Sequence, residues 1–554
     1  MRRMNAVIVV GLYLLALAIR LFAAGELPFP TTEPSAYYVN VAQNLIAGNG
    51  LVADGVWSYA TPPLAVPKPA FELWLPMSTF VSAAAMQVLG SSFWAAQAGS
   101  ALLGATVAPL AWAIGREAGR THGLDGRRGQ AVAITSGLLA AALSPLVLGS
   151  VVPDSYTPFT VFMLAGALLV PRVIGVRDGL PEHEGSRSMV AGLALGVAMG
   201  LAYLSRQEVV WQGLTVVLMM AWVLRWQPPG RRLRQAAMRL GPVVVGGLVI
   251  VLPWLLRNWL ELGSPLPGQA VENMFLIDNE DIFAFRDRPD AGTYLDQGLM
   301  TILSNPVVAA WDSLLNVIVL QAFPVGLVGL IALVAMRRSP ALRRPTALVA
   351  LLVGAALTFT STMLLFPVAT LWGTFMHASG PLLVALGVVA ALGGDALLAR
   401  ISEMRRWQKP NVILAPVALL ATAGLLTAFT VYVSSEQSRQ TQARYAALAA
   451  SLQAAAETAG RSVPGTLISD HPMWLAWATE RHAIALPDEP PEAVIELGGV
   501  FGATWVIVVD QRGRYPEALL ERSARACLVA DPMPLEAGTA DGWLFQLADE
   551  CATS

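Results

Sequence analysis

The stretch AVIVVGLYLLALAIRLFAA, residues 6–24, decides the class of this chain. It is about as long as a bilayer-spanning helix, which needs ~20 mostly apolar residues. It is too long for the apolar core of a secretion signal, and no small-residue cleavage pattern follows, so we expect it to be retained. The whole chain of 554 residues is 55% hydrophobic and only 13% charged, whereas soluble proteins are about a quarter charged. We therefore predict a mainly α-helical integral membrane protein.

Loop charge sets the orientation of the spans, because Arg and Lys concentrate on the cytoplasmic side. The basic connections and the basic amino terminus fall on one side if the polar-interrupted run Phe71–Leu89 is an interfacial or re-entrant helix. We therefore predict an inside amino terminus and an outside carboxyl terminus. The predicted 11 transmembrane helices lie near residues 6–24, 93–115, 131–149, 156–175, 189–204, 208–225, 240–257, 313–335, 346–365, 374–396 and 411–433.

This orientation divides the chain into a transmembrane domain, residues 1–433, and an outer domain, residues 434–554. Long outer loops are expected at residues 25–92, with interfacial helices, and at residues 258–312. Strand-like and helical stretches alternate in the outer domain, which predicts a small α/β layer around a parallel sheet. The only cysteines, Cys527 and Cys551, both lie there. An even pair in an oxidising compartment suggests a disulfide, two unpaired cysteines being the alternative.

An acidic and aromatic segment follows the first span, Glu33-Pro34-Ser35-Ala36-Tyr37-Tyr38. A carboxylate where a membrane meets water is costly to hold and chemically useful. Glu33 is therefore a candidate general base, with Tyr37 one turn later on the same helical face. The residues also allow structural interpretations, because Glu33 can cap the helix that Pro34 starts and the tyrosines can be interfacial belt residues.

Two further outer turns carry charged side chains between apolar helices. Asp154, which follows Pro153, either caps the next helix or meets a partner, a cation or water. Arg206 and Glu208 can form a local ion pair. An Arg on the outer side, against the general charge bias, would also suit a phosphate group.

Lys68 and His377 complete the candidate cationic groups. Lys68 is the only lysine on the predicted outer face and is either a phosphate contact or a snorkelling interfacial cation. His377 is either a hydrogen-bonded structural residue or a ligand of a metal or lipid phosphate. The sequence has no glycine-rich phosphate loop, HExxH or CxxC motif, so we expect no nucleotide cofactor. A net charge of −2 gives no sign of nucleic-acid binding.

Taken in order, these segments resemble the GT-C class of polytopic glycosyltransferases, and most nearly glycosyltransferase family 39, the protein O-mannosyltransferase and aminoarabinose-transferase type. Such enzymes move a sugar from a polyprenyl-phosphate carrier to a lipid or protein acceptor outside the cytoplasm. At the first position the family has Asp, often followed by Glu, where this chain has Glu33 and Pro34. The resemblance is carried by Glu33–Gly50, Pro67–Trp74, Pro153-Asp154, Arg206–Glu208, Leu252–Asn258 with Gly263–Pro265, and Gly373–His377.

The resemblance implies a glycosyltransferase of the plasma or inner membrane that inverts the sugar. It assigns Glu33 as the base and Asp154 as a second catalytic residue at the second-loop acidic position, which helps to bind the acceptor or a divalent metal such as Mg or Mn. It places Lys68, Arg206 and His377 at the carrier phosphate, with His377 as a further metal ligand.

The expected partners are a polyprenyl-phosphate sugar, a lipid or protein acceptor and the membrane itself. We assign Tyr37, Tyr38 and Glu208 to contacts with the acceptor or substrate. Two alternatives remain open. One is a transporter or flippase of lipid-linked glycans, although no internal repeat of the kind common in transporters is visible. The other is a catalytically silent membrane scaffold whose outer domain binds a partner.

Overall fold

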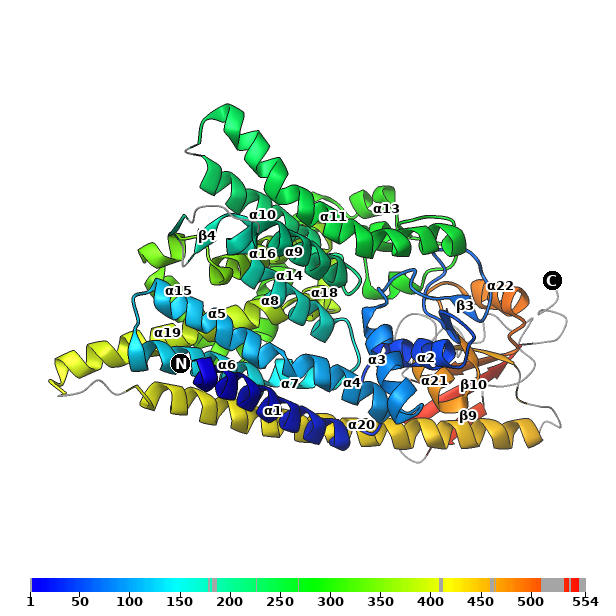
Figure 1. Cartoon of the computed structure of the whole chain (residues 1–554). Helices are drawn as coiled ribbons and strands as arrows, with labels where there is room; N and C mark the ends of the chain where they lie inside the picture. The colour runs from blue at the N-terminus through cyan, green and yellow to red at the C-terminus, as the bar shows by residue number, and fades with distance from the viewer. Residues whose placement is uncertain are drawn as a thin grey trace.

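A computed structural model of the chain is a helical bundle with a small sheet at one end (Figure 1). Within the part of the chain that the structure describes, eight helices or helix pairs are long and apolar enough to cross a membrane, so the chain is a multi-pass membrane protein. The structure describes residues 2–177, 180–181, 187–225, 227–267, 269–407, 412–458, 463, 465–509, 533–537 and 540–547.

Of the eight long candidates, seven match predicted spans, and the eighth, at residues 299–321, shares only residues 313–321 with the predicted span 313–335. The eight candidates are α1 (Arg2–Glu26), α4 with α5 (Phe93–Ala105, Val107–Thr121), α8 (Tyr156–Val173), α11 (Pro229–Leu262), α14 with the π-helix η2 (Leu299–Asp312, Ser313–Gln321), α16 (Ala347–Leu365), α19 (Gly380–Met404) and α20 (Leu414–Thr458). Shorter bundle helices are α6 (Gly126–Ala142), α7 (Ser144–Leu148), α9 (Arg187–Tyr203), α10 (Val209–Leu224) and α15 (Val325–Met336). The total of 11 spans remains a prediction.

Proline accounts for one of the differences from the predicted boundaries. The run expected at 313–335 is interrupted before α15, where Pro324 lacks the N–H that would continue the preceding helix. The membrane candidate begins earlier, at Leu299, so the loop expected at 258–312 ends at residue 298. The run Phe71–Leu89 yields α3 (Met77–Leu89), which has 13 residues and is about 20 Å long. It is too short to cross a ~30 Å hydrocarbon core, as the interfacial prediction requires.

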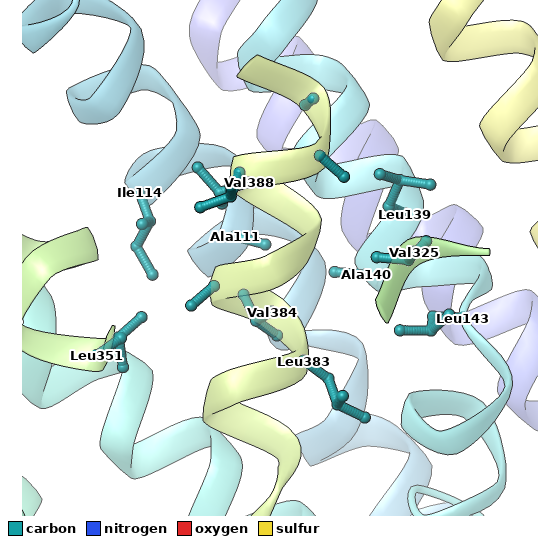
Figure 2. Packing of buried hydrophobic residues seen from close by; sticks show 14 of the residues in the cluster. Ala111, Ile114, Leu139, Ala140, Leu143, Val325, Leu351, Leu383, Val384 and Val388 are labelled. Carbon is teal, nitrogen blue, oxygen red and sulfur yellow. The ribbon is translucent and has the colours of Figure 1, made fainter. Parts of the chain in front are cut away.

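Helix α19 lies at the centre of the bundle (Figure 2). Its apolar side chains pack against residues of four neighbouring helices. These residues include Ile114 of α5, Leu139 of α6, Val325 of α15 and Leu351 of α16. Helices α9 and α11 approach one another even more closely. A Cβ on Gly196 would collide with the carbonyl oxygen of Val243, so the glycine lets the two backbones meet. This packing fixes the helix ends from which the candidate site is built.

At one end of the bundle the long connections and the C-terminal region gather into what we call the head. It contains α2 (Glu33–Ile46) and the described residues within 47–76, 263–298 and 463–547. Its connections include the ribbon of β1 (Val52–Ala53) and β3 (Lys68–Pro69), together with α12 (Gln269–Glu272), η1 (Asn279–Phe283) and α13 (Ala291–Asp296). The remaining short elements are α17 (Pro367–Leu371), α18 (Thr374–Ala378), η3 (Pro340–Arg343), β4 (Val176–Arg177) and β5 (Leu180–Pro181).

The sheet of the head has the strand order β2-β7-β6-β8-β10-β9. The predicted parallel pairing holds for β6, β7 and β8, while β9 and β10 add an antiparallel edge. Strand β2 comes from the first long connection, not from the C-terminal region, and pairs in parallel with β7. The strands are β2 (Gly55–Val56), β6 (Thr466–Ser469), β7 (His482–Ala485), β8 (Trp505–Val508), β9 (Met533–Ala537) and β10 (Ala540–Gln546), with α21 (Pro472–Thr479) and α22 (Pro491–Phe501) between them.

The sheet therefore joins two parts of the chain that the sequence assigned to separate domains. Helix α20 makes a second connection, because its 45 residues run without a break from the bundle to the sheet (Figure 1). Cys527 and Cys551, predicted to form a disulfide, lie outside the described residues.

Candidate functional site

A cavity of about 380 Å³ lies where the head meets the bundle. Its volume is in the range of pockets that hold small-molecule ligands. Helix α2 contributes Tyr38, the turns at the ends of α8 and α10 contribute Ser155, Arg206 and Glu208, and α18 contributes His377. Of the predicted site residues, Tyr38, Arg206, Glu208 and His377 thus share one cavity, and Asp154 lies directly behind its wall.

Asp154 and His377 form a hydrogen-bonded pair at this wall. The Asp154 Oδ2 is 2.8 Å from the His377 Nδ1, and its Oδ1 accepts hydrogen bonds from the backbone N–H and hydroxyl of Ser155. Burial alone would raise the pKa of Asp154, but His377, Ser155 and Arg206 outweigh it and lower that pKa to about 2. The carboxylate therefore stays ionised and fixes the imidazole with Nδ1–H toward it.

The second imidazole nitrogen, Nε2, is not engaged by Asp154. Among the described residues no side chain or carbonyl hydrogen-bonds to Nε2 of His377. Gly373 lines the cavity next to it with φ +110°, and a Cβ at this position would lie 3.5 Å from Nε2. With Nδ1 protonated, Nε2 carries a lone pair and can accept a proton from a ligand.

Arg206 supplies a positive group to the same wall. Its Nε and Nη2 hydrogen-bond to both oxygens of Glu208, with Nε at 3.2 Å from each, and Nη2 also donates to the Thr374 carbonyl at 3.1 Å. Its Nη1 donates to the Ser155 hydroxyl at 3.1 Å. A guanidinium has five N–H groups, so one Nη1 N–H keeps no partner among the described residues. That group can donate to an anionic ligand.

The donor set at the cavity does not fit a resident divalent cation. No group of three His, Cys, Asp or Glu side chains that could hold a metal occurs in the described part of the chain. The nitrogen of His377 that faces Asp154 is already hydrogen-bonded to it. The guanidinium of Arg206, bound to the adjacent Ser155, would repel a cation placed at Asp154.

Lys68 lies beside the cavity and not on its wall. Its Nζ is 2.8 Å from both carboxylate oxygens of Glu72 and 2.9 Å from the carbonyl oxygen of Ser58. An ammonium has three N–H groups, and these three acceptors use all of them. The Lys68 side chain is 4% exposed, so the structure places Lys68 in a buried ion pair and leaves it no free donor toward a phosphate.

Glu33 points away from the cavity, into the junction between α2 and the C-terminal region. Its Oε1 is 2.8 Å from the His471 Nδ1, and its Oε2 accepts the backbone N–H of Met473 at 2.9 Å, in the first turn of α21. Burial raises the pKa of Glu33, and these hydrogen bonds oppose that rise. The indole N–H of Trp474 adds a further link to the Pro30 carbonyl. Glu33 therefore joins the two halves of the head.

Tyr37 and Tyr38 are separated by their position on α2. The Tyr37 hydroxyl accepts the backbone N–H of Phe71 at 2.7 Å and is buried away from the cavity. Tyr38 lines the cavity near Ser155. The assignments of Glu33, Lys68 and Tyr37 to chemistry or ligand contact therefore remain predictions that the packing does not favour.

The arrangement of helices and head matches solved structures. ArnT from Cupriavidus metallidurans, crystallised with undecaprenyl phosphate, superposes with a TM-score of 0.56 at 14% identity over 98% of both chains. The same protein in its apo state gives 0.54 at 15% identity. Archaeal AglB from Archaeoglobus fulgidus, in complex with an inhibitory peptide and a dolichol-phosphate, gives 0.50 at 12% identity over 92% of this chain and 69% of that one.

The chain has the GT-C fold. The conclusion rests on three-dimensional structure, because no family profile and no curated protein matches the chain in sequence. Within this GT-C fold the cavity lies between the bundle and the head.

Several residues at the site were missed by the sequence analysis. Ser155 bridges Asp154 and Arg206, and only its place next to Asp154 could have suggested it. Glu72 could have been found from its i, i+4 spacing to Lys68, which is typical of ion pairs in helices. His471 carried no local signal, because its contact to Glu33 joins residues 438 positions apart.

Proposed function

We propose that this chain transfers a sugar from a polyprenyl-phosphate carrier to a hydroxyl group of a lipid or protein acceptor at the extracytoplasmic face of a membrane. The observation that carries the proposal is the Asp154–His377 pair at the wall of the cavity, with Nε2 of His377 unpartnered among the described residues and Arg206 alongside. The GT-C fold supports it. ArnT binds undecaprenyl phosphate and AglB a dolichol-phosphate in their crystal structures.

In this proposal His377 is the general base and Asp154 orients it. The acceptor hydroxyl gives its proton to the His377 Nε2 while its oxygen attacks the anomeric carbon of the sugar. The bond from that carbon to the carrier phosphate breaks, and its electron pair stays on the phosphate oxygen. One displacement of this kind inverts the anomeric centre. A correctly placed base contributes ~10²–10⁴-fold to the rate of such a step.

Arg206 holds the leaving phosphate through its remaining N–H. A fixed cation at the position where charge develops stabilises the transition state, because it does not need to reorient during the reaction. Glu208 keeps the guanidinium in place by accepting from two of its nitrogens. Tyr38 lies against the substrate on the α2 side of the cavity. Glu33, Lys68 and Tyr37 then hold the head together and touch no reacting group.

The test is sugar transfer in proteoliposomes from radiolabelled undecaprenyl-phosphate sugars. We expect transfer by the unaltered chain, and a ~10²–10⁴-fold loss in His377→Ala and Asp154→Asn. Glu33→Gln should retain transfer. Full transfer in both His377→Ala and Asp154→Asn would overturn the assignment of the pair, and loss only in Glu33→Gln would restore Glu33 as the base. Absence of transfer from every sugar donor would favour the transporter or scaffold.

A further inference from the structure

A second cavity lies on the flank of the bundle and is lined by other residues than the candidate site. It is a groove of about 700 Å³ between α1 and α20, which run beside one another in Figure 1. Phe22 of α1 and Tyr432 of α20 line it with most of their surface exposed. A Cβ added to Gly424, also in the lining, would meet no atom of another described segment within 4 Å. The groove is therefore open and is not filled by side chains of the described chain.

The length of the groove matches one leaflet of a bilayer. Its lining extends over residues 18–26 of α1 and residues 424–439 of α20. At 1.5 Å per residue these stretches are about 12 and 22 Å long, whereas the whole hydrocarbon core is ~30 Å thick. A transmembrane helix of a partner would need a seam across the whole core. An acyl chain of one leaflet needs only half of it, and it supplies the dispersion contacts that an empty groove would lose.

The polar groups left for a ligand lie at the end of the groove that is nearer the head. Ser435 is 3% exposed and lines the groove, and its hydroxyl makes no hydrogen bond within the described part of the chain. One helical turn further, Arg439 donates from Nη2 to the Oε2 of Glu26 at 2.7 Å. The other N–H groups of Arg439 and the Oε1 of Glu26 have no partner among the described residues. A buried hydroxyl without a partner is costly, so this end of the groove is suited to a polar ligand.

The order of these groups matches a glycerophospholipid. Such a lipid has an acyl chain, then an ester carbonyl, then a phosphate, and in phosphatidylethanolamine a terminal ammonium. The groove has an apolar lining, then the hydroxyl of Ser435, then the guanidinium of Arg439 beside the carboxylate of Glu26. A hydroxyl can donate to a carbonyl, and a guanidinium pairs with a phosphate through two parallel hydrogen bonds. The carboxylate can accept from an ammonium, which a choline headgroup cannot offer because it has no N–H.

We propose that the groove between α1 and α20 binds one molecule of phosphatidylethanolamine. Its acyl chain lies along the apolar lining, its phosphate meets Arg439 and its ammonium meets Glu26. The exposed ion pair of these two side chains contributes little by itself, so it can adjust to the headgroup. The bound lipid fills the space between α20 and α1 and stabilises the helix that continues into the sheet of the head. This inference does not depend on the proposed function.

The test is a binding titration that needs no sugar donor. The full chain in detergent is titrated with phosphatidylethanolamine, phosphatidylcholine or phosphatidylglycerol of identical acyl chains, and native mass spectrometry counts the bound lipids. We expect one tightly bound phosphatidylethanolamine and a Kd about tenfold weaker for each of the other lipids, the loss expected for one charged hydrogen bond. Equal or tighter binding of phosphatidylcholine or phosphatidylglycerol would overturn the assignment of the headgroup. Retention of no lipid would overturn the site itself.

Variants locate the binding at the groove. Gly424→Leu should fill the groove and weaken phosphatidylethanolamine binding at least tenfold, while the Tm without lipid stays unchanged because the space is open. Gly11→Leu is the matched control, because this glycine is also exposed on α1, has open space at its Cβ and lies outside the groove. Arg439→Gln should weaken binding about tenfold, whereas Arg338→Gln, at an exposed position away from the groove, should not. Undiminished binding in both Gly424→Leu and Arg439→Gln would contradict the proposal.

Discussion

Two buried carboxylates in this protein make the same contact and face different surroundings. Glu33 and Asp154 each lie 2.8 Å from the Nδ1 of a histidine. The imidazole beside Asp154 lines a cavity. The imidazole of His471 stacks near Trp474, at 5.2 Å between ring centroids, inside the junction of the head. A carboxylate–histidine pair therefore does not by itself indicate catalysis. What distinguishes the two pairs is whether the imidazole can reach a ligand.

The largest expected difference is in the rate of transfer. His377→Ala should lower kcat about 10²–10⁴-fold, because it removes the group that accepts the proton. His471→Ala should change kcat by less than about tenfold, because its ring has no place at the cavity. The measurement is single-turnover transfer with saturating donor. Equal losses of kcat in the two variants would show that access to the cavity does not distinguish a catalytic carboxylate–histidine pair from a structural one.

Glu72, a third buried carboxylate, extends the comparison to an ion pair. Lys68→Met should lower the free energy of unfolding by ~3–5 kcal/mol, because it leaves the Glu72 charge buried without its partner. The double variant Lys68→Met/Glu72→Met should recover most of this loss. Stability is followed by thermal unfolding in detergent. If the stable double variant bound undecaprenyl phosphate with a tenfold weaker Kd, Lys68 would again be assigned to contact with the donor phosphate.

At the junction, Glu33→Gln should cost about 1–3 kcal/mol of stability, since an amide offers one acceptor oxygen where two donors are buried. Protease cleavage between the two halves of the head should become faster. Glu26→Gln is the control, because its ion pair with Arg439 is 38–54% exposed and such pairs contribute ~0–1 kcal/mol. Equal stability of the two variants would argue against a joining role for Glu33.

The pH dependence of stability should differ in sign between the two carboxylates. The pKa of Asp154 is lowered from 3.8 to about 2, so its ionised form contributes roughly 2 kcal/mol above pH 4, lost as the pH falls through 2. The pKa of Glu33 is raised, so its contribution is present at low pH and lost as the pH rises through the raised value. Unfolding of Asp154→Asn and Glu33→Gln at pH 2–7 checks both trends. A parallel pH profile in the two variants would contradict these directions.

Much of the fold is predictable because it follows local rules. Apolar length located α1, α8, α16 and α19, and the polar interruptions of the run before residue 90 indicated the short α3. Alternating patterns located β6, β7 and β8. The break before α15 depends on a single proline inside an otherwise apolar run, which hydropathy does not register.

The site was predictable only as a set of residues that lie on the same side of the bundle. Loop charge grouped Asp154, Arg206 and His377, and the structure brings these three together. Loop charge could not distinguish the role of Glu33 from that of Asp154, because the difference depends on His471 and Met473, far away in the sequence.

The pairing of β2 with β7 has a consequence for the order in which the protein is made. Ribosomes deliver the first long connection early, but the strand and the histidine that receive it emerge over 400 positions later. Until then Glu33 has no His471 and β2 has no neighbour. The nascent chain must keep this segment soluble while the whole bundle is inserted. Chains that stop before residue 471 should therefore leave the ribosome with an unpaired β2 and an unpartnered Glu33 in the first loop.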